Sequence, residues 1–184
     1  MQLYNSVKRV RSSIFVAVVV LVMPALAQNQ NQTQQNWSTY EDPILGISIE
    51  YPSSWKIEEE PNTVSFKLYE NESKPLIFSS VVAMRSLPGI DTNEEFMKSD
   101  VNTLRNSISK IYEIDNAATI GGKPASKIVF DVKLGIGKYK DHIIGYYMVY
   151  REMLYYIAFH IVIDNYTKYI PTIQKMVDSF KIIE

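Results

Sequence analysis

The chain has 184 residues, with 19 basic and 20 acidic side chains and a formal net charge of −1. This length is sufficient for one domain with a hydrophobic core, and 46% hydrophobic against 21% charged residues excludes an intrinsically disordered chain. Cysteine is absent, so we expect no disulfide bond, no thiolate metal site and no lipid anchor on cysteine.

The N-terminal segment has the pattern of a signal peptide. Three basic residues precede an uninterrupted apolar run from Ile14 to Met23. Ala25 and Ala27 then form the A-x-A pattern at which signal peptidase cuts, so we predict that residues 1–27 are a signal peptide cleaved after Ala27. The alternative is an uncleaved membrane anchor, but a membrane span needs about 20 apolar residues and this stretch is shorter.

Cleavage would also change the charge of the protein. It removes Lys8, Arg9 and Arg11, which leaves 16 basic side chains against 20 acidic ones. Nucleic-acid-binding proteins need a basic face, so this balance argues against nucleic acid as a partner. We expect a secreted or extracytoplasmic protein, which is membrane-associated if the leader stays in place.

A polar segment follows the leader. Residues 28–37 are mostly Gln and Asn, too polar to bury, and are predicted to be a flexible linker before one domain at residues 38–184. Four Asn-x-Ser/Thr acceptors are candidates for N-glycosylation: Asn31, Asn36, Asn71 and Asn165.

Alternating apolar and polar residues predict three early strands, at residues 47–51, 64–68 and 76–84. The acidic run 58–60 lies between the first two. Three consecutive carboxylates could attract a cation, but before Pro61 we expect them in a solvated loop.

Two amphipathic helices are predicted. Thr92 and Glu95 have the spacing of a capping box, which marks a helix start. Apolar residues then recur at spacings of four and three and predict a helix that reaches Ile111; they are Met97, Val101, Leu104, Ile108 and Ile111. The same spacing between Tyr166 and Phe180 predicts a final helix.

The second half of the chain is rich in strand patterns. Gly121 and Gly122 form a turn before a strand at residues 126–132, and the apolar runs 143–150 and 153–163 form a hairpin. Both faces of that hairpin are apolar, so the sheet must be covered on both sides. The order of elements predicts an α+β fold, an α/β/α sandwich with a central antiparallel sheet.

Candidates for chemistry are few. His142 and its neighbour Asp141 form a weak candidate metal pair, although a solvated strand end is the favoured interpretation, and His160 is expected to pack inside a strand. The glycine segments 121–123 and 135–138 lack the spacing of a phosphate loop and are predicted to be hairpin turns. No catalytic motif is visible, so we expect no cofactor, no firm metal site and no enzymatic activity.

Tyrosine is abundant, with 13 residues, and five of them crowd the predicted hairpin. They could form a partner-binding surface, because tyrosine is favoured at interfaces, although strand propensity explains them equally well. The five are Tyr146, Tyr147, Tyr150, Tyr155 and Tyr156.

Three segments resemble one known family. Residues 43–55, PILGISIEYPSSW, resemble the opening of PsbP-like domains, in which a Gly-(Phe/Ile)-x-(Ile/Phe)-x-Tyr-Pro-x-x-Trp stretch precedes the sheet. Residues 121–125, GGKPA, look like the mid-domain turn of that family, and residues 177–181, VDSFK, look like the end of its final helix. The chain therefore resembles a divergent exported member of the PsbP-like family over nearly all of its mature part.

The resemblance implies an α/β/α sandwich that serves as a non-enzymatic accessory or binding module. The namesake of the family is an extrinsic photosystem II subunit on the lumenal side of a membrane, but no functional site of the family maps onto this chain. The first hypothesis is therefore an exported accessory module that docks on a membrane or cell-envelope protein. The alternative is an extracytoplasmic domain that binds a small ligand or a metal, with or without weak hydrolytic activity.

Overall fold

The computed structural model describes residues 35–71, 74–85, 87–133, 140–162 and 166–183. Residues 34–184 form one compact unit, and the first strand begins at Trp37, one residue before the predicted start of the domain. The predicted signal peptide, its cleavage after Ala27, the turn at 135–138 and the acceptors Asn31 and Asn165 lie outside the described residues.

Ten strands and two helices make up the described part of the chain. The first half contains β1 (Trp37–Asp42), β2 (Ile47–Pro52), β3 (Lys56–Glu60), β4 (Thr63–Asn71), β5 (Lys74–Arg85) and α1 (Asn93–Leu104). The second half contains β6 (Ile108–Ile120), β7 (Lys123–Lys133), β8 (Lys140–Tyr150), β9 (Met153–Val162), α2 (Tyr166–Ser179) and β10 (Lys181–Ile182).

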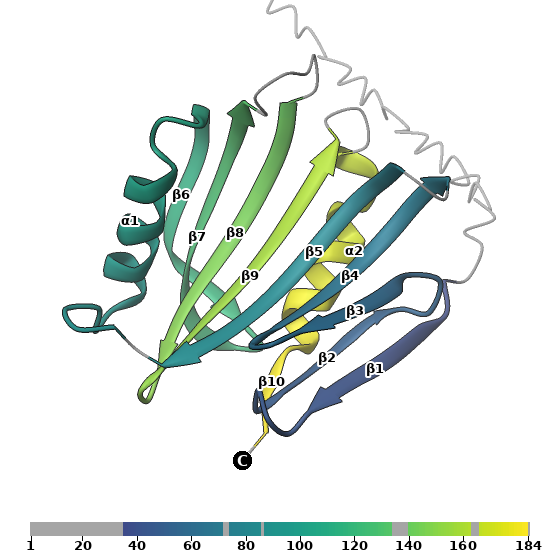
Figure 1. Cartoon of the computed structure of the whole chain (residues 1–184), viewed down its shortest axis with the longest axis horizontal. Helices are drawn as coiled ribbons and strands as arrows, with labels where there is room; N and C mark the ends of the chain where they lie inside the picture. Colours follow the sequence, from purple (N-terminus) through teal and green to yellow (C-terminus); the bar gives the residue numbers. More distant parts are fainter. Residues whose placement is uncertain (1–34, 72–73, 86, 134–139, 163–165, 184) are drawn as a thin grey trace, which may run out of the picture. The chain divides into compact units, whose positions relative to one another are not determined.

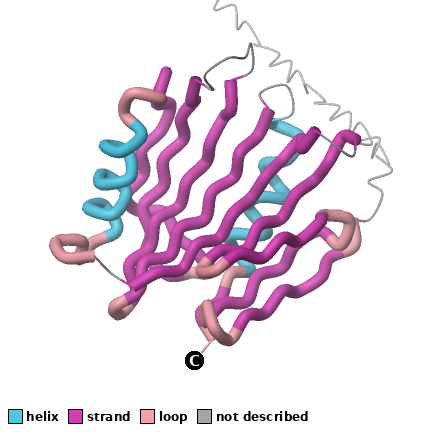
Figure 2. Tube along the Cα trace, in the orientation of Figure 1, coloured by secondary structure: helices cyan, strands magenta, loops and turns pink. Residues whose placement is uncertain are grey.

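The strands form two sheets, which Figures 1 and 2 show as a broad sheet and a small one. The large sheet has seven strands in the order β3-β4-β5-β9-β8-β7-β6, and the small sheet has the order β1-β2-β10. Each described pairing between neighbouring strands is antiparallel. The predicted central antiparallel sheet is confirmed.

The large sheet is buried on both faces, as the apolar hairpin predicted. On one face Tyr147 and Leu154 pack in a core with Phe96 and Met97 of α1. On the other face the strands pack against α2 and the small sheet in a second, larger core. The fold is therefore the predicted α+β sandwich, with the difference that one outer layer combines a helix with three short strands.

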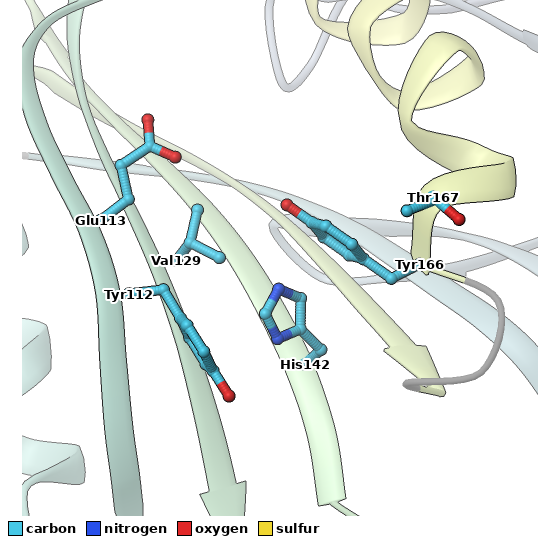
Figure 3. Close-up of a pocket in the computed structure, with 6 residues that line it drawn as sticks. All are labelled: Tyr112, Glu113, Val129, His142, Tyr166 and Thr167. Carbon is cyan, nitrogen blue, oxygen red and sulfur yellow. The ribbon is translucent and has the colours of Figure 1, made fainter.

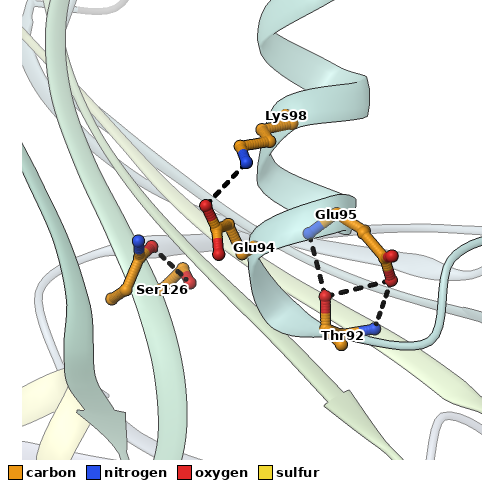
Figure 4. A network of polar contacts seen from close by, with 6 residues as sticks. Thr92, Glu94, Glu95, Lys98 and Ser126 are labelled. Carbon is orange, nitrogen blue, oxygen red and sulfur yellow. Dashed lines mark hydrogen bonds and ion pairs between the residues drawn. The ribbon is translucent and has the colours of Figure 1, made fainter.

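The N-terminus of α1 is fixed by the predicted capping box (Figure 4). The Glu95 backbone N–H donates to the Thr92 hydroxyl at 3.2 Å, and the Glu95 carboxylate accepts from the Thr92 backbone N–H at 3.0 Å. Next to the cap, the side chain of Asn93 donates to the Pro124 carbonyl and accepts from the Val149 backbone N–H. These bonds attach the start of α1 to β7 and β8.

The prediction that this helix reaches Ile111 was wrong. The helix ends at Leu104, whose carbonyl accepts from the Ser107 backbone N–H at 2.7 Å in a turn. Ile108 and Ile111 instead open β6 and pair with Val132 and Phe130 of β7. Both residues are β-branched, which favours a strand, and pairing with β7 satisfies their backbone groups. The apolar residues keep a helical spacing past Leu104, but this spacing does not reflect a helix there.

The acidic run 58–60 was also misplaced, because it forms most of β3 instead of a loop. All three glutamate side chains are exposed at one edge of the large sheet, and Glu58 pairs with Lys67 of β4. Charged side chains on an edge strand discourage pairing with other chains. This edge is therefore protected.

The turn between β6 and β7 is fixed against the end of α2. Gly121 and Gly122 have φ angles of 54° and 75°, which glycine adopts without strain in a tight hairpin turn. The Gly121 backbone N–H donates to the Val177 carbonyl at 3.0 Å. A Cβ on Gly121 would lie 1.9 Å from the Phe180 carbonyl oxygen, so this contact holds β6 in place relative to α2.

We expect Gly121→Ala to lower the free energy of unfolding by more than about 2 kcal/mol, because the left-handed backbone and the collision with Phe180 both disfavour a side chain. Gly122→Ala is the matched control, since its added Cβ meets nothing within 4 Å and only the backbone conformation is strained. Urea denaturation measures both variants. If both variants lower the free energy of unfolding equally, the contact with α2 does not constrain the turn.

Candidate functional site

A pocket of about 370 Å³ lies between strands β6 to β8 and the first turn of α2 (Figure 3). Its volume lies at the small end of the range for pockets that bind small ligands. Six residues of the described part line it: Tyr112, Glu113, Val129, His142, Tyr166 and Thr167.

His142, which lines this pocket, is paired with a buried aspartate behind it. Asp131 of β7 lies directly opposite His142 of β8 in the strand register. His142 Nδ1 is 2.7 Å from Asp131 Oδ1, and the two residues are 8% and 2% exposed. A carboxylate accepts hydrogen bonds, so Nδ1 is the protonated ring nitrogen of His142 in this pair.

Tyr112 gives the carboxylate a second hydrogen bond. Its hydroxyl donates to Asp131 Oδ2 at 2.7 Å. This hydrogen bond to a carboxylate stabilises the protonated phenol and so raises the pKa of Tyr112. The geometry depends on a β-bulge, because Ile111 and Glu113 face successive residues of β7 and leave Tyr112 as the extra residue. Bulges re-aim side chains, and this one lets the consecutive residues Tyr112 and Glu113 line the same pocket.

The second ring nitrogen of His142 has no hydrogen-bond partner among the residues that the structure describes. Nε2 is buried, and in Figure 3 it points away from the strand, toward the space near Val129. The rings of Tyr166 and Tyr112 pack against the imidazole, with centroids 4.2 and 5.2 Å away. In the tautomer with its proton on Nδ1, His142 has a lone pair at Nε2, which is then a buried hydrogen-bond acceptor beside the pocket.

The rim of the pocket carries a carboxylate that is paired with a lysine. Glu113 forms an ion pair with Lys127, whose Nζ lies 2.9 Å from one carboxylate oxygen. Burial and then the negative charges of Glu113, Asp178 and Asp115 raise the pKa of nearby Tyr146 to about 12. These carboxylates therefore act on the Tyr146 phenol, while Lys127 balances the charge of Glu113.

The sequence suggested Asp141 as the partner of His142 in a candidate metal pair, but the structure pairs His142 with another aspartate. His142 bonds Asp131 on the neighbouring strand, and the side chain of Asp141 lies outside the described part. Among the described residues, no group of three or more His, Asp or Glu side chains is arranged to hold a metal ion. His160 is half-buried on β9, where its ring packs against Phe78 with centroids 5.3 Å apart.

The five hairpin tyrosines do not form one exposed surface. Tyr146, Tyr147 and Tyr155 are buried in the two cores, and only Tyr150 and Tyr156 are partly exposed. The Tyr147 hydroxyl donates to Asp100 of α1 at 2.6 Å. The predicted partner surface is therefore incorrect for the three buried residues, because the two-sided covering of the sheet places them inside.

Two other predicted positions can be located. Asn36 is exposed at the start of the described chain, and Asn71 is the last residue of β4, with its side chain outside the described part. Sequence reasoning missed Asp131, Tyr112 and Tyr166. Asp131 carried a signal, since it is an acidic residue within an apolar strand, whereas nothing local indicated the two tyrosines.

Exposed apolar side chains gather on β6, the last strand of the large sheet. Ile111, Tyr112 and Ile114 are 43%, 50% and 54% exposed. We call these three residues the β6 apolar edge. Ile111 and Ile114 pair with Phe130 and Ile128, whose side chains face α1, so they project on that side of the sheet while Tyr112 lines the pocket on the other.

Comparison with known proteins places these features in a family. The family model described as PsbP matches residues 35–182. No curated protein sequence matches the chain. Within the residues that the structure describes, no helix has the length and apolar character that a membrane span requires.

Several solved structures share the fold. Cyanobacterial PsbP from Synechocystis sp. PCC 6803 is 15% identical, with a TM-score of 0.57 over 85% of this chain and 98% of that chain. The Ran-binding protein Mog1p of Saccharomyces cerevisiae is 12% identical, with a TM-score of 0.57 over 82% of this chain and 97% of that chain. LpqN of Mycobacterium tuberculosis, described as involved in cell envelope biogenesis, is 12% identical. Its TM-score is 0.50 over 82% of this chain and 91% of that chain. Identities this low show a common fold and no more.

We expect Asp131→Asn to lower the free energy of unfolding by about 2 to 3 kcal/mol, because it weakens two charge-assisted hydrogen bonds to a buried group. Glu113→Gln is the control, since it removes a carboxylate from an exposed ion pair that contributes at most about 1 kcal/mol. Chemical denaturation measures both. If both variants lower the free energy of unfolding by the same amount, the hydrogen bonds of Asp131 stabilise the domain no more than an exposed ion pair does.

Proposed function

Because the chain belongs to the PsbP family, we propose that it is an exported, non-enzymatic accessory module that docks on a protein partner at the membrane or cell envelope. The leader pattern of residues 1–27 supports export. The fold is shared with a Ran-binding protein and with a protein involved in cell envelope biogenesis, which is in keeping with a binding role.

The observation that carries the proposal is the contrast between the two edges of the large sheet. An edge strand has unpaired backbone groups and is normally protected by charge. Edge strand β3 follows this rule with Glu58, Glu59 and Glu60. Edge strand β6 also carries the exposed charges of Lys110 and Glu113, but between and beside them it exposes Ile111 and Ile114. The partner that we propose covers these two apolar side chains.

The arrangement favours a partner segment that runs beside β6. Ile111 and Ile114 project on one side of the sheet and Tyr112 on the other, so a segment lying along the edge would contact both sides. Pairing with an exposed edge strand supplies backbone hydrogen bonds, and side-chain contacts then give specificity. The bulges in β6 interrupt regular pairing along this edge, so the contact that we propose depends chiefly on side chains and not on a continuous series of backbone hydrogen bonds.

We expect the double variant Ile111→Lys, Ile114→Lys to lose at least about 90% of partner recovery, because two desolvated charges oppose docking. The measurement is a pull-down from detergent-solubilised envelope with the purified protein as bait. Ile44→Lys is the matched control, since Ile44 is 93% exposed in the turn between β1 and β2, away from β6. Recovery of no partner by the native protein, or equal loss with both variants, would count against the proposal.

Export has its own test. N-terminal sequencing of the native protein should begin at Gln28, because signal peptidase cuts after the second small residue of the A-x-A pattern. The Ala27→Gln variant should retain the leader and shift the protein to the membrane fraction. A native protein that begins at Met1 would contradict the proposed release.

The second candidate function is the binding of a small ligand in the pocket at His142. The specific observation in its favour is the cavity itself, which lies beside a buried histidine nitrogen that lacks a partner. A hydrolytic version is less well supported, because His142 Nε2 bonds no hydroxyl group that could act as a nucleophile.

A further inference from the structure

We propose that the pocket at His142 binds the guanidinium group of an arginine side chain that the docking partner presents beside β6. This inference rests on the proposed function, because it assigns the ligand to a protein partner. It extends that function by naming the chemical group that the partner inserts.

Two acceptors of the pocket, His142 Nε2 and the Glu113 carboxylate, favour a ligand that donates hydrogen bonds. His142 Nε2 is a buried acceptor, and leaving it without a partner is unfavourable. Glu113 uses one carboxylate oxygen for Lys127, and in Figure 3 the polar ends of Glu113 and Tyr166 extend toward the space between them. Guanidinium carries five N–H donors and no acceptor, in a planar fork that can reach two acceptors at once.

Charge and shape favour a guanidinium group over an anion or an ammonium group. An anion would meet the carboxylates of Glu113 and Asp131, and the lone pair of His142 would repel it. A lysine ammonium is a strongly hydrated point charge and cannot bridge separated acceptors as a flat fork does. A flat cation also suits the aromatic rings of Tyr166 and Tyr112, whose π-faces attract positive charge. Lys110 already uses this attraction on Tyr112, with its Nζ 4.2 Å from the ring centre.

The surroundings of the pocket indicate a protein source for the guanidinium group. Tyr112 lines the pocket on one side of β6, and Ile111 and Ile114 project on the other side of the same strand, so the two features meet at the sheet edge. A segment that lies along β6 would place one side chain at the pocket, while its neighbours cover Ile111 and Ile114. Arginine is among the residues that dominate binding energy at interfaces when its surroundings are desolvated.

Binding of N-acetyl-L-arginine amide to the purified protein tests the proposal, with the ring signals of His142 and Tyr166 followed by NMR. The capped arginine should bind at least about tenfold more tightly than capped citrulline, which has the same shape without the charge. Glu113→Gln should weaken binding of the capped arginine about fivefold or more, and Tyr166→Phe should weaken it by a smaller factor. Glu94→Gln, which removes a lysine-paired carboxylate from α1, should leave binding unchanged.

Equal affinity for capped arginine and capped citrulline would overturn the inference, as would an equal effect of Glu113→Gln and Glu94→Gln. The pull-down separates this failure from failure of the proposed function. Recovery of a partner could require Ile111 and Ile114 and yet be unchanged by excess capped arginine and by Glu113→Gln. That result would support the docking function and overturn the arginine assignment. Selective arginine binding with no partner recovered would contradict the protein source, and the docking function with it.

Discussion

Burial of the β8–β9 hairpin on both faces is the constraint on which the rest of the structure depends. Its strands place Tyr147 and Leu154 under α1, and Tyr146 and Ile157 under α2 and the small sheet. A sheet with two apolar faces is stable in water only when both are covered, so the helices must lie on opposite sides. The aromatic side chains of this hairpin are therefore mainly structural.

Irregular pairing of the edge strand β6 creates the pocket and the β6 apolar edge, the two features on which the proposed function depends. β6 contains three register irregularities, and one of them turns Tyr112 into the pocket beside Glu113. A regular strand would send these two consecutive residues to opposite faces. The same strand lies at the edge of the sheet, where α1 leaves Ile111 and Ile114 exposed. Pocket and apolar edge thus share one structural origin.

The buried pair of Asp131 and His142 links packing to recognition. Asp131 is satisfied by bonds from Tyr112 and His142, which keeps a carboxylate inside the domain and orients the imidazole. The orientation leaves Nε2 facing the cavity. A rigid acceptor beside a pocket and an apolar edge is a suitable anchor for a partner that brings both apolar and donor groups.

The sequence by itself determined the elements that local patterns encode: the capping box at Thr92, the glycine turn at Gly121, the two-sided hairpin and the α+β class. It did not determine where the first helix ends, because the apolar spacing continues past Leu104 and only pairing with β7 makes Ile108 a strand residue. The pocket was also beyond local patterns, since Tyr112, Asp131, His142 and Tyr166 lie on four different elements. Only the register of β6 to β8 and the docking of α2 bring them together, because such contacts depend on long-range pairing and packing.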